Sequence, residues 1–249
     1  MLRRALGVGL AVAALALAGC GRLPRPTLAP ATDAAPTTTV DPHLNTVAQA
    51  LDSVHQVPVF DGPGAPAPGR TLDNPQPSGA PLVFLVRQEQ PDWLQVLLPV
   101  RPNGSTGWVR RADVQVSHHD FRIVVELHAH HITVYKGSTV MYAGPIGVGT
   151  HDTPTPGGLY YTKELIQPVD QAGRYIPDGP YGPFAYGLSG FSNVLSSFAG
   201  GDGVVGIHGT NDPTALGRDV SHGCIRISNG AITALAKVLP LGVPVEIRV

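Results

Sequence analysis

One cysteine, set among histidines, glycines and a serine, is the residue of this sequence best suited to covalent chemistry. The two relevant stretches are His208-Gly209-Thr210 and Ser221-His222-Gly223-Cys224-Ile225-Arg226. A cysteine attacks as the thiolate, so it needs a base, and His208 and His222 are both candidates. Gly223 permits a tight turn whose successive N–H groups can face a developing oxyanion. The pattern predicts nucleophilic catalysis by Cys224.

Two other interpretations of this cysteine stay open at the level of sequence. A lone cysteine is often a small buried hydrophobe, although the polar and glycine neighbours of Cys224 argue against apolar surroundings. His208, His222 and Cys224 could also hold zinc, but no fourth ligand follows at a regular spacing. We therefore expect no metal ion and no cofactor.

The elements that must position these residues are short strands and one helix. Val204–Ile207 is apolar and predicts a strand that fixes His208. Ser228 or Asn229 is suited to cap a helix that carries Ile232 and Leu235 and ends before Pro240. Further strands are predicted at Arg122–Leu127 and His131–Tyr135, which would form a hairpin, at Val140–Val148, and at Val243–Ile247.

A Gly- and Pro-rich stretch precedes the predicted strand at Val204 and contains three aromatic residues. Tyr181, Phe184 and Tyr186 lie in this stretch. Loops of this kind often carry function, so the stretch fits a lid over a substrate, and it fits equally well a segment packed on the sheet. The sequence does not separate the two.

The preceding part of the chain has a β pattern of its own. Apolar runs at Leu82–Val86, Trp93–Leu98 and Gly107–Val109 predict short strands, and Pro102-Asn103-Gly104 predicts a turn. The residues around Trp93 and Trp108 resemble bacterial Src-homology-3-like domains, and core packing is favoured for at least one tryptophan. Before this region, Asp41, Pro42 and apolar residues from Leu44 to Val54 at helical spacing predict a short helix.

The beginning of the chain has the pattern of an export signal. Arg3 and Arg4 precede an apolar run, Ala5–Ala18, that is too short to span a bilayer. Leu17-Ala18-Gly19-Cys20 resembles the lipobox of bacterial lipoproteins, which implies lipid on Cys20 and a membrane-anchored protein facing the cell wall or periplasmic space. The Pro-, Ala- and Thr-rich residues that follow predict a tether.

Composition limits the remaining classes of fold and function. The 249 residues include 30 glycines and 25 prolines, and the net charge is −1. Frequent Gly and Pro disfavour long helices, so we expect a mainly β protein. No basic stripe is present to neutralise phosphates, so no nucleic-acid partner is expected. The predicted organisation is a signal peptide at 1–19, a lipidated tether at 20–50, a small β domain at 51–116 and a second domain at 117–249.

The second domain resembles the L,D-transpeptidase catalytic domain. The resemblance rests on His208-Gly209-Thr210, on the cysteine motif, and on Gly147-Val148-Gly149 and Thr153–Pro156 upstream. Two departures are Gly157-Gly158, where the family usually has Thr-Gly, and a short spacing between His208 and Cys224. The resemblance implies a β-sandwich-like fold with one short helix.

The resemblance also implies roles. Cys224 would be the nucleophile, His208 the base, and the Gly209 carbonyl the group that orients the imidazole. The amides of His222, Gly223 and Cys224 would form the oxyanion hole. Support of the motif or substrate would come from Ser221, Arg226 and Thr210.

The implied partners are peptidoglycan stem peptides, with carbapenem β-lactams as covalent inhibitors. The expected reaction cuts a stem tetrapeptide after its third residue, releases D-Ala, and passes the acyl group to an amine of the diaminopimelate type. An L,D-carboxypeptidase acting on the same substrate and a non-catalytic wall-binding lipoprotein remain as alternatives.

Overall fold

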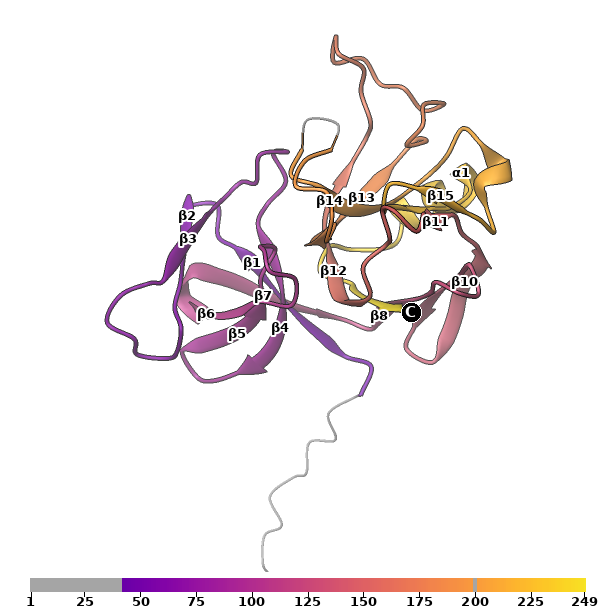
Figure 1. Cartoon of the computed structure of the whole chain (residues 1–249). Helices are drawn as coiled ribbons and strands as arrows, with labels where there is room; N and C mark the ends of the chain where they lie inside the picture. The colour runs from indigo at the N-terminus through magenta and orange to yellow at the C-terminus, as the bar shows by residue number, and fades with distance from the viewer. Residues whose placement is uncertain (1–41, 199–200) are drawn as a thin grey trace, which may run out of the picture. The chain divides into compact units, whose positions relative to one another are not determined.

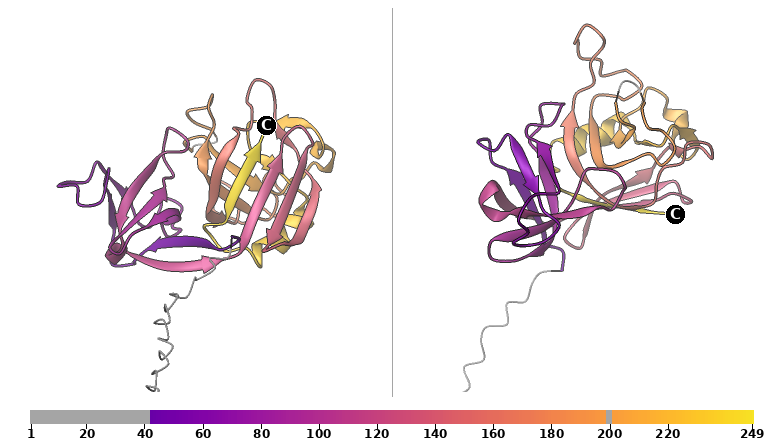
Figure 2. Two further views of the ribbon diagram at one scale, coloured as in Figure 1. Left: turned by 90° about the horizontal axis from the view of Figure 1, so that it is seen from below. Right: turned by 60° about the vertical axis from the view of Figure 1, so that its left-hand side comes forward.

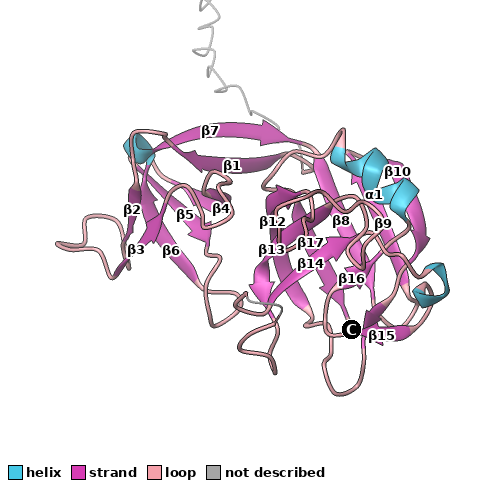
Figure 3. Ribbon diagram, turned by 90° about the horizontal axis from the view of Figure 1, so that it is seen from above, coloured by secondary structure: helices cyan, strands magenta, loops and turns pink. Residues whose placement is uncertain are grey.

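The computed structural model describes residues 42–198 and 201–249. The predicted signal peptide, Cys20 and the tether up to residue 41 lie outside the described residues. Within the described part, strands dominate and a single α-helix is present (Figure 3). The expectation of a mainly β fold with one short helix is therefore confirmed. No helix among the described residues is long and apolar enough to cross a membrane.

The first part of the described chain, here called the N-terminal module, ends at His119. Its elements are β1 Asn45–Ala50, β2 Gln56–Val59, β3 Arg70–Asp73, β4 Val83–Glu89, β5 Trp93–Leu97, β6 Thr106–Arg110, the 3-10 turn η1 Arg111–Asp113 and β7 Val114–His119. Five strands pair in the order β6-β5-β4-β1-β7, and β2 pairs with β3 (Figure 1). Trp108 is buried, as favoured for one of the two tryptophans, while Trp93 is partly exposed. The likeness to a Src-homology-3 domain stays a prediction.

The helix predicted from Asp41 to Val54 is wrong, because Asn45–Ala50 forms strand β1. This strand pairs with β4 on one side and with β7 on the other. Ala48 and Ala50 point into the core of the module, and Val47 is buried on the opposite face. Apolar residues spaced for one helical face also suit a strand that is covered on both faces, and the two neighbouring strands decide between them. The first sheet thus begins at Asn45, inside the predicted tether.

The C-terminal module follows directly. Its elements are β8 Phe121–Glu126, β9 His131–Lys136, β10 Thr139–Pro145, β11 Val148–Gly149, β12 Gly158–Ile166, β13 Ala185–Phe191, β14 Val204–His208, the 3-10 turn η2 Pro213–Ala215, β15 Asp219–Ser221, β16 Ile225–Arg226, α1 Asn229–Ala236 and β17 Pro244–Arg248. The predicted hairpin, the strand before His208, the closing strand and the helix capped by Ser228 are all confirmed.

Eight strands of this module pair in the order β10-β9-β8-β17-β12-β13-β14-β16. Figure 2 gives two further views of the ribbon. Strand β12 changes partner along its length: its first half pairs with β17, and its second half pairs with β13 after an irregularity between Thr162 and Glu164. Such an irregularity bends a strand, so β12 carries the chain from one face of the core to the other. Helix α1 packs Ile232 and Leu235 into the same core.

The two modules share buried contacts. The Tyr161 side chain is fully buried in a cluster with residues of β1, β4 and β5, and its hydroxyl donates to the Val83 carbonyl at 3.0 Å. Gln76 donates from Nε2 to the Lys163 carbonyl at 3.0 Å, and the Lys163 ammonium donates to Gln76 and Glu164. Apolar packing and satisfied buried polar groups together tie the N-terminal module to β12.

Candidate functional site

His208 is the last residue of β14 and is held on two sides. Strand β14 pairs antiparallel with β13 and parallel with β16, so His208 lies opposite Arg226. Val205 and Ile207 are buried within this strand, and His208 itself is only 4% exposed. A strand inside a sheet, covered on both faces, is among the most rigid supports a side chain can have. The base predicted from sequence is therefore firmly placed.

The Gly209 carbonyl orients the imidazole. It lies 2.5 Å from Nδ1 of His208, which fixes Nδ1 as the protonated nitrogen and leaves Nε2 to accept a proton. A Cβ at Gly209 would meet Oδ1 of Asn229 at 2.2 Å, so no larger residue fits there. The same Oδ1 accepts the Thr210 amide at 2.8 Å. Asn229, considered in the sequence only as a helix cap, thus stabilises the turn after His208.

Ser221 holds the turn that presents Cys224. Its Oγ donates to the Cys224 carbonyl at 2.5 Å and accepts the Gly223 amide at 3.0 Å. Gly223 has a φ of +113°, which other residues rarely adopt. Oγ of Thr153, from the upstream motif, donates to the Ser221 carbonyl at 3.1 Å. The upstream motif therefore supports the nucleophile turn, while the Gly223 amide already has a partner inside it.

The predicted catalytic residues meet at one cavity of about 230 Å³. It is lined by Pro180, Tyr181, Phe198, His208, Ser221, His222, Cys224 and Arg226. Cys224 is a free thiol and partly exposed, with Sγ 4.0 Å from the Val204 carbonyl. Thr210 is buried beside this site rather than lining it, with its amide on Asn229. The structure thus brings Cys224 and both candidate bases together.

The three aromatic residues of the predicted lid stretch divide between the two interpretations. Tyr186 is buried in β13 and donates from its hydroxyl to the carbonyls of Leu235 and Leu239. Phe184 packs against the same core. The Tyr181 ring lies edge-on to the His208 ring, with 4.9 Å between centroids, and lines the cavity. Only Tyr181 is therefore placed to meet a substrate.

Phe198 is a site residue that the sequence did not reveal. Its ring stacks on His222, with centroids 4.9 Å apart and an angle of 28° between planes. No local motif surrounds Phe198, because it is an isolated aromatic in a loop and its partner is far along the chain. The stack also shows that the His222 side chain packs against the cavity wall, whereas His208 is held by the strand.

Burial sets the charge state of the site. Loss of water lowers the pKa of His208 to about 4, against the raising effect of the Gly209 carbonyl, and the Arg226 charge lowers it further. Burial raises the pKa of the Cys224 thiol, although the Gly206 amide and Arg226 act in the opposite direction. Desolvation disfavours both charged forms, so the resting pair near neutral pH is a thiol and a neutral imidazole.

Among the described residues that line the cavity, Arg226 is the only arginine or lysine. Its Nε is buried without a hydrogen-bond partner among the described residues. Its backbone is fixed by two hydrogen bonds to Gly147, at 2.8 and 2.9 Å. A guanidinium that has an unpaired donor and stands on a fixed backbone suits an anionic group of a substrate.

Metal binding receives no support from the described residues. In 42–198 and 201–249, no group of three or more His, Cys, Asp or Glu side chains is arranged to hold a metal ion. His208, His222 and Cys224 are not arranged in such a group.

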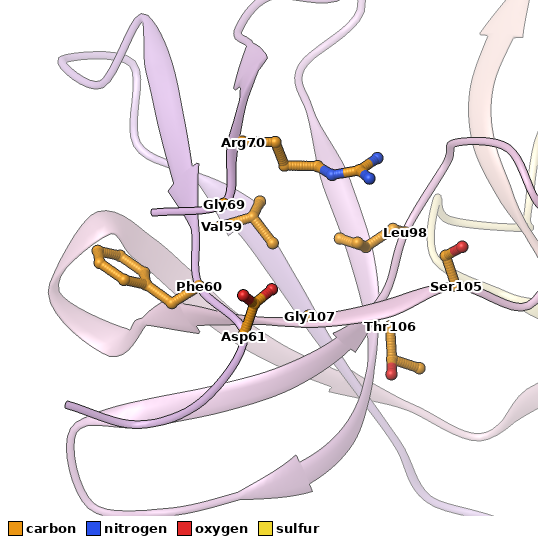
Figure 4. A pocket seen from close by; sticks show the side chains of 9 residues that line it. All are labelled: Val59, Phe60, Asp61, Gly69, Arg70, Leu98, Ser105, Thr106 and Gly107. Atoms are coloured by element: carbon orange, nitrogen blue, oxygen red, sulfur yellow. The ribbon is translucent and has the colours of Figure 1, made fainter. Parts of the chain in front are cut away.

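The N-terminal module has a cavity of its own, of about 250 Å³ (Figure 4). Asp61 and Arg70 are among its lining residues, and Gly107 forms part of its wall. A Cβ at Gly107 would meet Cγ1 of Val59 at 2.3 Å, so the close approach of β6 to β2 requires glycine. The residues that line this cavity include no cysteine and no histidine.

Comparison with known proteins identifies the family of the C-terminal module. The family model for the L,D-transpeptidase catalytic domain (YkuD) matches residues 120–247, slightly more than half of the chain. The chain belongs to the L,D-transpeptidase catalytic domain family. This module, here called the catalytic domain from now on, contains every residue of the cysteine motif.

Individual relatives agree with the family. The Bacillus subtilis protein YkuD, which carries the name of an L,D-transpeptidase, is 36% identical over 128 residues, 51% of this chain and 66% of its own length. YqjB of the same species is 29% identical over 50% of this chain and 69% of its own length. An L,D-transpeptidase structure from Mycobacterium tuberculosis covers 60% of this chain and 75% of its own, with 18% identity and a TM-score of 0.41. This chain therefore covers just under two thirds of the length of the Bacillus subtilis YkuD protein.

The lowered pKa of His208 predicts an acid-sensitive fold. Between pH 6.5 and about 4, His208 binds a proton in the unfolded chain but not in the folded chain. The free energy of unfolding therefore falls as the pH falls through this window. Urea unfolding should show that wild type loses about 3 kcal/mol more than His208→Gln between pH 7 and pH 4. Parallel losses in the two proteins would show that His208 is not a buried neutral imidazole.

Proposed function

We propose that this protein is a cysteine L,D-transpeptidase that cross-links peptidoglycan. The observation that carries the proposal is the shared cavity of Cys224 and His208, in which the Gly209 carbonyl turns Nε2 of the imidazole toward proton transfer. Membership of the family supports the reaction class. The donor substrate is a stem tetrapeptide, and its cleaved bond follows the third residue.

Acylation starts from the neutral pair. As Sγ of Cys224 attacks the carbonyl carbon of the third residue, Nε2 of His208 takes the thiol proton, so that charge develops only with bond formation. The amides of His222 and Cys224 stabilise the oxyanion; the Gly223 amide joins them if it leaves Ser221. The C–N bond then breaks, and His208 returns the proton to the amine of departing D-Ala.

Transfer reverses the same steps. An amine of the diaminopimelate type loses its proton to His208 and attacks the thioester, forming a C–N bond as the C–S bond breaks. The thiol proton returns from His208 to Cys224, so atoms and charge balance over the cycle. The Arg226 guanidinium, with its free donor capacity, binds a carboxylate of a stem peptide.

Water in place of the amine would make the enzyme an L,D-carboxypeptidase. Both reactions pass through the same thioester, so the distinction lies in the product. A wall-binding protein without activity is the second alternative, and the buried base beside a free thiol speaks against it. Mass analysis of the products from a stem tetrapeptide, with and without an amine acceptor, separates all three.

Acylation by a carbapenem tests the nucleophile. A strained β-lactam ring should open on Cys224, because its carbonyl can use the same oxyanion donors as a peptide. Intact-mass analysis after incubation with imipenem should show one covalent adduct on wild type and none on Cys224→Ala. An unmodified wild-type protein after prolonged incubation would falsify the proposal of an active thiol.

The two histidines should differ in their effect on reactivity. His208→Ala should remove nearly all acylation near neutral pH, with part of the rate returning at higher pH where the thiol ionises unaided. His222→Ala should leave slower but measurable acylation, because its side chain packs on Phe198. The pH dependence of imipenem acylation of Cys224 in both variants is the measurement. A larger loss of acylation in His222→Ala than in His208→Ala would assign the base to His222 instead.

The anchor is proposed from the sequence at the chain's start. Leu17-Ala18-Gly19-Cys20 behind two arginines supports lipid attachment at Cys20 and a position on the membrane facing the wall. Cys20→Ala should move the protein out of the membrane fraction without changing the imipenem reaction of Cys224. A Cys20→Ala protein that still sediments with membranes would refute the anchor.

A further inference from the structure

One wall of the Cys224 cavity is a loop rather than a strand. Residues 191–198 and 201–204, here called the active-site arm, lead from the end of β13 into β14. Phe198 of the arm stacks on His222 and lines the cavity. A small pocket of about 10 Å³ lies where the arm meets the Cys224 turn, and Ser192, Leu195 and Gly203 line it on the arm side. The arm thus packs directly against the turn that carries the nucleophile.

The arm has limited support of its own. The Ser192 amide donates to the Gly203 carbonyl at 2.8 Å, and Phe198 and Gly201 exchange amide–carbonyl hydrogen bonds at 2.8 and 2.9 Å. Phe191 is buried at the base of the arm, but Val194 and Phe198 remain exposed, so the rest of the arm buries little apolar surface. A loop with few buried contacts opens easily unless another element holds it.

Arg101 of the N-terminal module supplies that support. Its Nη1 donates to the Ser192 carbonyl at 2.7 Å, and its Nη2 donates to the carbonyls of Leu195 and Asp202, each at 2.9 Å. Its guanidinium also lies 4.8 Å from the centre of the Phe191 ring. The planar guanidinium of Arg101 therefore binds three carbonyls, which come from both halves of the arm. A guanidinium suits this role because it presents several donors in a rigid fork.

Asn103, in the same turn as Arg101, fixes the base of the arm. Its Nδ2 donates to the Phe191 carbonyl at 2.7 Å, and its Oδ1 accepts the Phe191 amide at 2.9 Å. The side-chain amide thus pairs with both backbone groups of one residue, as a neighbouring strand would. The Pro102 carbonyl accepts from Ser105, which closes the turn that carries both side chains.

We propose that Arg101 and Asn103 are positioning residues of the active site, through which the N-terminal module shapes the Phe198 wall of the Cys224 cavity for a peptide-sized substrate. The proposal rests on the proposed function for what the cavity binds. It assigns the N-terminal module a part in substrate recognition, which neither the family match at 120–247 nor the cysteine motif contains. Cys224 and His208 keep their own supports, so their intrinsic chemistry does not depend on Arg101.

The test compares a bulky and a small thiol reagent on the full chain. Imipenem needs the cavity wall, whereas iodoacetamide needs only the thiol. Arg101→Ala should slow imipenem acylation about tenfold, as misplacement of binding groups does, and leave iodoacetamide alkylation within about twofold of wild type. Arg101→Lys should recover part of the acylation rate. Phe198→Ala should resemble Arg101→Ala, and the double variant should be slowed less than the product of the two effects.

Arg111→Ala is the matched control. Arg111 is an arginine of the same module that pairs with Glu89 at the surface, so its removal tests the loss of an arginine alone. Wild-type imipenem rates in Arg101→Ala would overturn the proposal. So would equal slowing of both reagents in Arg101→Ala, because that result indicates general damage.

Hydrogen exchange keeps the two proposals separable. Amides of residues 191–198 should exchange faster in Arg101→Ala than in Arg111→Ala. This expectation does not depend on which reaction the protein catalyses. A wild-type protein that iodoacetamide labels and imipenem does not would refute the transpeptidase, while the exchange result still decides whether Arg101 holds the arm. Unchanged hydrogen exchange in Arg101→Ala would alone refute the proposal that Arg101 supports the arm.

Discussion

The parallel pairing of β14 with β16 is the constraint on which the rest of the site depends. It joins Ile207 to Ile225 and His208 to Arg226, so the base and the cation come from adjacent strands, and Cys224 directly precedes the second of them. Parallel neighbours need a connection that leaves the sheet and returns. Here that connection is the stretch from Gly209 to Cys224, which contains η2 and β15. The nucleophile turn therefore belongs to the crossover itself, and strand pairing fixes its two ends.

Burial of the base and shielding of the thiol have a chemical consequence. Both charged forms are disfavoured by desolvation, so the site does not hold a ready thiolate–imidazolium pair. In the proposed mechanism, charge appears only as the substrate carbonyl enters, and the amides of the turn are then available to the oxyanion. A neutral thiol also reacts slowly with small electrophiles. Reactivity is therefore tied to a carbonyl that fits the cavity.

The sequence predicted most of the site and less of what surrounds it. Cys224, His208, Gly209 and Ser221 belong to local motifs, and local motifs can be read without a structure. Strand β1 was wrongly predicted as a helix, because the apolar spacing of Leu44 to Val54 fits both and its partners β4 and β7 lie far along the chain. The same reason hid Phe198 and Arg101. Phe198 and Arg101 lie outside every motif, and only the folded chain brings them to His222 and to the Ser192 carbonyl.

The cavity combines two kinds of wall, and they have different physical origins. The side formed by His208 and the Ser221–Cys224 turn rests on strands and satisfied hydrogen bonds within the catalytic domain. The side formed by Phe198 rests on a loop whose carbonyls find their donors in the N-terminal module. Catalytic groups need a rigid support. A loop that contacts the substrate can vary in conformation when a second domain holds it in place. The family match delimits the catalytic domain at residues 120–247, and in our proposal the selection of substrate extends beyond that boundary to the turn between β5 and β6.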